Sequence, residues 1–207
     1  MGYLRQKLSS NSLRQRLSFT VLLFIILFFG VMTVSYFLLP EGVLKNKNPL
    51  QNWETSDNTA ILTMQIFFYN MLSVLMIAFA SLFGKKKESE TNYLSVGYLV
   101  FFVQICINGI VVGTWSFALG GEAIPFLNRI TRTFDLAHRA GLWEMAGQLL
   151  ITCSLAHISA VLTSGNDTIT RKIRSIRLNK GEALALIVGF ALMLAGAVIE
   201  SIAINSL

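Results

Sequence analysis

The chain has 207 residues, of which 54% are hydrophobic and 14% charged, and its mean hydropathy is +0.60. These values are typical of a membrane protein, and the length leaves no room for a soluble domain of ordinary size beside the apolar stretches. The formal charge of +6 does not indicate a nucleic-acid-binding protein, because the cations gather in particular gaps between those stretches.

Residues 1–17 are predicted to form a cytoplasmic basic arm. Two basic fragments, 4–8 and 13–17, are separated by the polar run 9–12. Leu4 and Leu13 would lie on opposite sides of one continuous helix, so we expect two helical pieces. Asn11 or Ser12 is placed to cap the second piece, which runs into the first apolar stretch.

Five apolar stretches follow, each long enough to cross a bilayer, which takes roughly 20 residues of helix. We therefore predict an all-α, polytopic membrane protein in which residues 18–207 form one domain of five transmembrane helices with short interfacial helices. The spans are expected at about residues 18–39, 60–83, 93–119, 140–164 and 183–206.

The basic residues predict the orientation. Twelve precede the first span, follow the second or separate the fourth from the fifth, whereas five lie in the other two gaps. Because cytoplasmic loops carry the excess of Lys and Arg, the N-terminus is expected in the cytoplasm and the C-terminus outside.

Two connecting segments have the pattern of helices that lie on a membrane surface. In residues 168–178, isoleucines repeat at helical spacing and the other face is basic, with Arg171, Lys172, Arg174 and Arg177. Such a helix is either a topological anchor held against anionic lipid or a docking helix for a cytoplasmic partner. A shorter apolar stripe follows Pro125.

Polar side chains inside the spans are the candidate functional residues. Four of the five spans place one carboxamide or carboxylate at a similar depth, which predicts a single polar centre extended by two glutamines on the same helix faces. The residues are Asn70, Asn108, Glu144, Glu200, Gln104 and Gln148. Amides in spans often do no more than bond neighbouring helices, whereas intramembrane acids are functional candidates by default.

Small residues predict close helix packing. Gly109 and Gly113 form a small-xxx-small seam, and Gly141, Gly189 and Gly196 are further sites of close approach. Cys106 and Cys153 lie inside spans without metal or redox spacing, so we interpret them as small buried residues.

Catalytic patterns are missing from the sequence: it has no zinc motif, no nucleophile elbow and no phosphate loop. We therefore predict no enzyme activity, no catalytic residue, no metal and no cofactor. An intramembrane hydrolase would have to assemble Glu144, Glu200 and either His138 or His157 across helices.

The polar landmarks resemble motifs of the stage II sporulation protein M family. The segment 66–70 is similar to the family's F-x-x-N pattern, 108–113 to N-G-x-x-x-G, 141–144 to H-G-x-x-E and 197–200 to A-x-x-E. The resemblance covers spans two to five. In the third motif Ala140 stands where relatives have His, and His138 lies two residues earlier.

This resemblance implies a five-span protein of the bacterial cytoplasmic membrane, acting as a non-catalytic component of a membrane complex in engulfment, or in bacteriocin export or immunity. It implies a membrane-protein partner or an ATP-binding transporter subunit. The expected partners are thus the lipid bilayer and such a subunit, with a homo-oligomer as a further arrangement and no nucleic acid. The alternative is a transport component in which Glu144 and Glu200 titrate or line the path.

Overall fold

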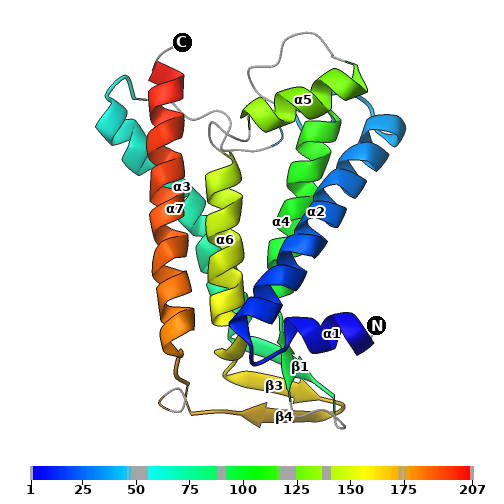
Figure 1. The fold of residues 1–207 in the computed structure, drawn as a ribbon, viewed down its shortest axis with the longest axis vertical. Coiled ribbons are helices and arrows are strands. Elements are labelled where there is room, and N and C mark those ends of the chain that lie inside the picture. Colours follow the sequence, from blue (N-terminus) through cyan, green and yellow to red (C-terminus); the bar gives the residue numbers. More distant parts are fainter. Residues whose placement is uncertain are drawn as a thin grey trace.

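A computed structural model describes residues 2–45, 47, 56–87, 92–116, 125–136, 141–172, 174 and 176–205; for residues 132–136 it describes only the backbone. Within these residues the chain is mostly helical, with a small sheet at one end of the helices (Figure 1). The helices are α1 (Gly2–Leu8), α2 (Leu13–Leu38), α3 (Thr59–Ser81), α4 (Gly97–Gly113), α5 (Phe126–Leu136), α6 (Leu142–Ser154) and α7 (Lys180–Asn205).

Three of these helices, α2, α3 and α7, are long and apolar enough to cross a membrane. By length and composition they are consistent with a membrane protein, and they lie at the places expected for the first, second and fifth spans. Helix α2 begins at Leu13, as expected for the second helical piece that runs into the first span, so that Arg14 and Arg16 belong to the helix. The basic arm does form two pieces, α1 and the start of α2, and Ser12 occupies the N-cap position without a side-chain bond.

The other two predicted spans are shorter in the structure. Helix α4 has 17 residues and α6 has 13. The predicted spans 93–119 and 140–164 were wrong at their ends near the sheet: residues 93–95 form a strand, Leu155–His157 form a 3₁₀ turn (η3), and residues 161–164 form another strand. Apolar composition carried the prediction past the helix ends, because a buried strand and a buried helix end look alike in hydropathy.

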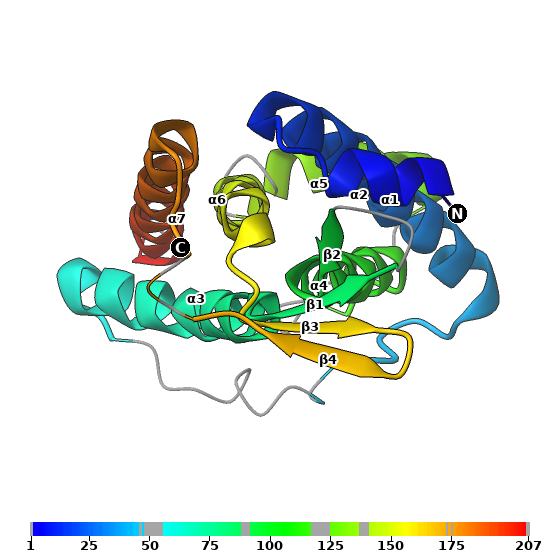
Figure 2. The same ribbon diagram turned by 90° about the horizontal axis from the view of Figure 1, so that it is seen from below.

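The sheet is the main departure from the predicted all-α fold. Strands β1 (Phe83–Lys86), β2 (Tyr93–Ser95), β3 (Val161–Ser164) and β4 (Asp167–Thr170) form one four-stranded sheet in the order β2-β1-β3-β4 (Figure 2). The two outer pairs are antiparallel, whereas β1 and β3 are parallel. We call this end of the molecule the sheet end, and the opposite one, which carries α5, the α5 end.

The interfacial helix predicted at 168–178 is likewise wrong. Residues 167–170 form β4, which pairs with β3 so that Ile169 lies opposite Leu162. A two-residue connection, Gly165-Asn166, joins the strands, and Gly165 adopts a φ of 58°. The hairpin is favoured over the predicted helix because β-branched residues flank a tight turn, and glycine readily adopts the positive φ that this turn requires. In contrast, the stripe after Pro125 does form a helix, α5.

Close packing of α4 on α2 uses the predicted glycine seam. A Cβ atom at Gly109 would lie 2.9 Å from the Phe28 carbonyl oxygen, and one at Gly113 would collide with Met32 and Ser35. The backbones of α2 and α4 therefore approach closely. Ile105, on the same stripe of α4 as Gly109, lies with Met32 in the fully buried core between α2, α4 and α6.

Helix α6 lies near the middle of the bundle, between α7 and the α2–α4 pair (Figure 2). Its contact with α7 depends on Gly147, Gly189 and Gly196: a Cβ at Gly147 would lie 2.6 Å from the Gly189 carbonyl oxygen. Gly147 was not singled out in the sequence. Gly141, which was, is not a packing site between helices, since a Cβ there would meet only the Met145 side chain of α6 itself.

We expect Gly147→Ala to destabilise the protein by about 1–3 kcal/mol, because the added methyl group forces apart two backbones that touch. Gly30→Ala is the matched control, since a Cβ at Gly30 of α2 meets nothing within 4 Å. Thermal unfolding in one detergent measures both variants. Equal midpoints for Gly147→Ala and Gly30→Ala would contradict the α6–α7 contact described above.

Candidate functional site

A polar cluster joins α3, α6 and α7 in the half of the bundle toward the α5 end. The Asn70 side-chain amide of α3 donates a hydrogen bond to the Glu144 carboxyl of α6. Glu200 of α7 interacts directly with Glu144, so that two carboxyl groups and one amide meet. We call these three residues the carboxyl cluster.

The local packing explains why the cluster is held in place. Gly196 lies against the backbone and side chain of Glu144, where a Cβ would be 3.2 Å from Glu144 Cγ. Nearer the α5 end, the hydroxyls of Thr63 and Ser201 are 2.6 Å apart and add a second polar tie between α3 and α7. Around Glu144, hydrogen bonds connect α3 to α6 and α7, and a close glycine contact packs α7 against α6.

The structure does not bring all six predicted polar residues together. Gln148, one turn from Glu144 on α6, is buried, with 7% of its surface exposed. Asn108 and Gln104 are half-buried on α4, and the Gln104 carbonyl oxygen is buried without a hydrogen-bond partner within the described residues. Among those residues we find no hydrogen bond that joins Gln104, Asn108 or Gln148 to the carboxyl cluster.

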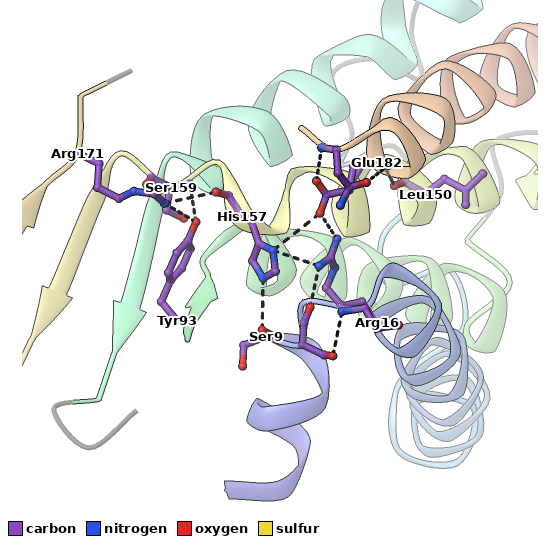
Figure 3. A network of polar contacts seen from close by, with 12 residues as sticks. Ser9, Arg16, Tyr93, Leu150, His157, Ser159, Arg171 and Glu182 are labelled. Atoms are coloured by element: carbon purple, nitrogen blue, oxygen red, sulfur yellow. Dashed lines mark hydrogen bonds and ion pairs between the residues drawn. The ribbon is translucent and has the colours of Figure 1, made fainter. Parts of the chain in front are cut away.

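A second polar network, absent from the sequence prediction, lies at the sheet end (Figure 3). Arg16 of α2 and Glu182 of α7 form an ion pair whose side chains are 0% and 4% exposed. The same guanidinium donates to the Ser10 carbonyl oxygen at 2.7 Å and to His157 Nδ1 at 3.1 Å. We call Arg16, Glu182 and His157 the buried triad.

Glu182 is fixed by the start of its own helix. Its second carboxyl oxygen accepts from the Asn179 backbone N–H at 3.0 Å, while the Asn179 side chain accepts from the Glu182 N–H at 2.8 Å. This reciprocal capping box satisfies backbone donors at the start of α7. The pattern Asn179-x-x-Glu182 was the one sequence signal that pointed toward the triad, through the acid that it positions.

The geometry defines the protonation of His157. A guanidinium has no acceptor, so the 3.1 Å contact requires Nδ1 to accept; Nε2 then carries the proton and donates to the Ser9 carbonyl oxygen at 3.3 Å. Burial, followed by the Arg16 charge, lowers the His157 pKa below its ordinary value of 6.5. Glu182, 3.8 Å from Nδ1, acts in the opposite direction, but the net direction is downward because Arg16 is closer and already neutralises that carboxylate.

The triad continues into the sheet through Arg171, which follows β4. Its guanidinium donates to the Tyr93 hydroxyl at 3.0 Å and to the Ser159 carbonyl oxygen at 3.3 Å (Figure 3). Ser159 in turn donates its backbone N–H to the Tyr93 hydroxyl and its side-chain hydroxyl to Ser81 at the end of α3. Of the four cations assigned to an interfacial helix, Arg171 is therefore half-buried and structural, whereas Lys172, Arg174 and Arg177 are exposed.

At the α5 end another buried cation, Arg129, holds α5 against the bundle. Arg129 donates to the Gly113 carbonyl oxygen and to the Glu41 carboxylate, each at 2.5 Å. Its guanidinium also lies over the rings of Tyr36 and Trp115, at 4.7 and 5.5 Å from their centroids. Because Arg129 is fully buried, this contact ties α5 to the ends of α2 and α4.

Across the described ranges, we find no group of three or more His, Cys, Asp and Glu side chains that could hold a metal ion. Cys153 is buried and donates to the Thr20 hydroxyl, which is a structural arrangement. His138 lies outside the described residues. The described contacts at these sites bond helices to one another.

Comparison with known proteins gives no relative: no family model, no curated protein and no solved structure matches the chain. The function is therefore argued from the sites themselves.

We expect Arg16→Met to destabilise the protein by about 3–5 kcal/mol, because Glu182 would be left buried without its cation. Adding Glu182→Gln should recover much of that loss, since glutamine keeps the capping box and removes the unpaired charge. Arg14→Met, at an exposed position two residues away, is the control and should stay within about 0.5 kcal/mol of wild type. Thermal unfolding tests the series; a double variant no more stable than Arg16→Met would refute the ion-pair account.

The His157 pKa predicts how stability depends on pH. Because the folded protein binds this proton less readily than the unfolded chain, stability should fall as the pH drops below 6.5. His157→Gln should flatten that decline in the window from pH 7 to 5.5. Unfolding midpoints measured at several pH values in this window provide the test, and an identical decline in both proteins would contradict the neutral, buried His157.

Proposed function

We propose that this chain is a non-catalytic integral membrane component of a membrane complex, with five spans and the sheet end in the cytoplasm. The three long apolar helices supply three of the spans. In the proposed arrangement the apolar helices α4 and α6 also cross the membrane and supply the other two spans. Helix α6 is shorter than the bilayer core, but it is surrounded by α2, α3, α4 and α7.

Charge supports the proposed orientation. Within the described residues the sheet end carries the basic residues of the N-terminal arm, of β1 and of the segment after β4. The α5 end has Arg129, whose charge is met by Glu41, and the exposed Lys45 and Lys47 that follow α2. By the positive-inside rule the sheet end is the cytoplasmic one, so that the N-terminus is inside and the C-terminus outside.

The observation that carries the proposal is the carboxyl cluster. Asn70 of α3 donates a hydrogen bond to Glu144 of α6, Glu200 of α7 interacts with Glu144, and Gly196 of α7 packs against Glu144. Such an arrangement joins three helices. A protein that assembles with other subunits needs a rigid bundle that presents fixed surfaces to them, and the joined helices provide such rigidity.

The resemblance to the stage II sporulation protein M family supports the class of complex. Three of the four motif residues, Asn70, Glu144 and Glu200, meet in the carboxyl cluster, whereas Asn108 does not join them. We accordingly propose a bacterial cytoplasmic-membrane protein with an engulfment-type role, or one associated with export or immunity, whose partner is another membrane protein or an ATP-binding transporter subunit.

A second candidate function is a transport component, favoured by the direct contact of Glu144 with Glu200. Two carboxylates in contact repel each other strongly away from water, and a proton shared between them removes that repulsion. In this function the pair takes up and releases a proton as the substrate crosses.

The double substitution Glu144→Gln and Glu200→Gln separates the two functions, because the amides keep hydrogen bonding but cannot titrate. With a membrane-assembly role, the tagged variant should recover the same partner proteins from native membranes as wild type. With the transport role, partner recovery should persist, but the proton movement that accompanies transport into vesicles should be lost.

Asn70→Leu and Asn108→Leu form a matched pair for the cluster itself. Asn70→Leu removes the bond to Glu144 and should lower partner recovery, whereas Asn108→Leu should not. Wild-type protein that recovers no partner, even after cross-linking in native membranes, would overturn the assembly role.

A further inference from the structure

Strand β4 is an open edge of the sheet. It is the last strand in the order β2-β1-β3-β4, and β3 is its only strand neighbour within the described residues. All four of its residues are exposed, and in Figure 1 it lies on the side of the sheet away from the helices. An exposed strand edge is a ready template for pairing with another chain.

The register identifies the backbone groups that face outward. Arg171 donates its N–H to the Ala160 carbonyl oxygen at 2.7 Å, and Ile169 lies opposite Leu162. Because antiparallel residues alternate between bonding inward and outward, Ile169 bonds toward β3 like Arg171. Thr168 and Thr170 therefore present their N–H and C=O groups to the open side.

The charge around this edge selects the kind of partner. Arg174 and Arg177 follow β4 and are exposed. Asp167 is the one acid that β4 contributes. Among the described residues of β4 and the segment that follows it, positive charge therefore predominates, which attracts an acidic chain and repels a basic one.

Two other occupants fit less well. A second copy of this protein would bring two cationic edges together. Anionic lipid would satisfy the charges but offers no row of donors and acceptors to match Thr168 and Thr170, and β4 lies on the far side of the sheet from the spans (Figure 1). An extended acidic polypeptide matches both the hydrogen-bond row and the charge.

We infer that β4 is the docking strand for an acidic, extended segment of a water-soluble partner protein, which adds to the sheet as a fifth strand. This inference rests on the proposed function, since it requires the sheet end to face the cytoplasm. Main-chain hydrogen bonds to Thr168 and Thr170 supply the affinity, and the flanking cations supply the preference for acidic sequence.

The test uses the full chain in nanodiscs of neutral phosphatidylcholine and a fluorescent heptapeptide of alternating Glu and Val, followed by anisotropy. Thr168→Pro removes one outward N–H while leaving the bonds to β3, since Thr168 does not donate inward. It should weaken binding by about tenfold, as should Arg174→Gln with Arg177→Gln. Thr168→Ala, which keeps the backbone donor, should bind like wild type, and unchanged unfolding midpoints should show that each variant is folded.

Three results would overturn the inference: no binding of the acidic peptide to wild type, equal binding of an alternating Lys and Val peptide, or equal binding by Thr168→Pro and Thr168→Ala. Vesicles of phosphatidylglycerol that bind the nanodisc through Arg174 and Arg177, when the peptide does not bind, would assign these cations to lipid instead. If Thr168→Pro still recovers all partners from native membranes, the docking strand is refuted and the proposed assembly role stands.

Discussion

A guanidinium buried in a small bundle must be surrounded by acceptors, and this requirement organises the sheet end. Arg16 meets it with a carboxylate from α7, a carbonyl oxygen from the turn after α1 and a ring nitrogen from η3. These partners come from the beginning, the middle and the last helix of the chain. Because each acceptor must be in place for the charge to be tolerated, the ion pair fixes where α2 and α7 start relative to each other. The bonds of Arg171 to Tyr93 and Ser159 extend the same constraint to the sheet.

The helices that begin at this fixed end then pack by two different means. Helices α2 and α4 meet along glycines and an apolar core, whereas α6 and α7 combine glycine contacts with the carboxyl cluster. In lipid the hydrophobic effect does not drive helices together, so close backbone approach and interhelical hydrogen bonds must do so. Placing the acids on the α6–α7 seam therefore gives stability and specificity at the same position: a register shift of either helix would separate Glu144 from Glu200.

The sequence was informative where a single physical rule dominates. Apolar length located α2, α3 and α7, and the small-residue spacing at Gly109 and Gly113 located the α2–α4 contact. The similar depth of Asn70, Glu144 and Glu200 in their spans correctly predicted that they lie together. Depth could not predict that Asn108 faces elsewhere, because the rotation of α4 about its axis is set by the packing of Gly109 against α2. The β3–β4 hairpin was missed because hydropathy assigned residues 161–164 to a span and the spacing of isoleucines assigned residues 168–178 to a helix, although β-branched residues around Gly165-Asn166 indicate a hairpin. The buried triad could not be predicted, since its partners are distant in sequence and a lone arginine before a span is usually exposed.

The sheet gives the basic side of the protein a shape that a set of loops would not have. Loops rich in Lys and Arg satisfy the positive-inside rule by charge alone, whereas strands β1 to β4 add an edge of defined hydrogen-bond spacing on the same side. That edge is connected to the interior: Arg171, next to β4, bonds to Ser159, and Ser159 bonds to the end of α3, the helix that carries Asn70. A partner that adds a strand at β4 would therefore pull on a segment bonded to α3, and its binding energy would be shared with the packing around the carboxyl cluster. Such a connection is compatible with the proposed role of a subunit that holds other proteins in a fixed relation to the membrane.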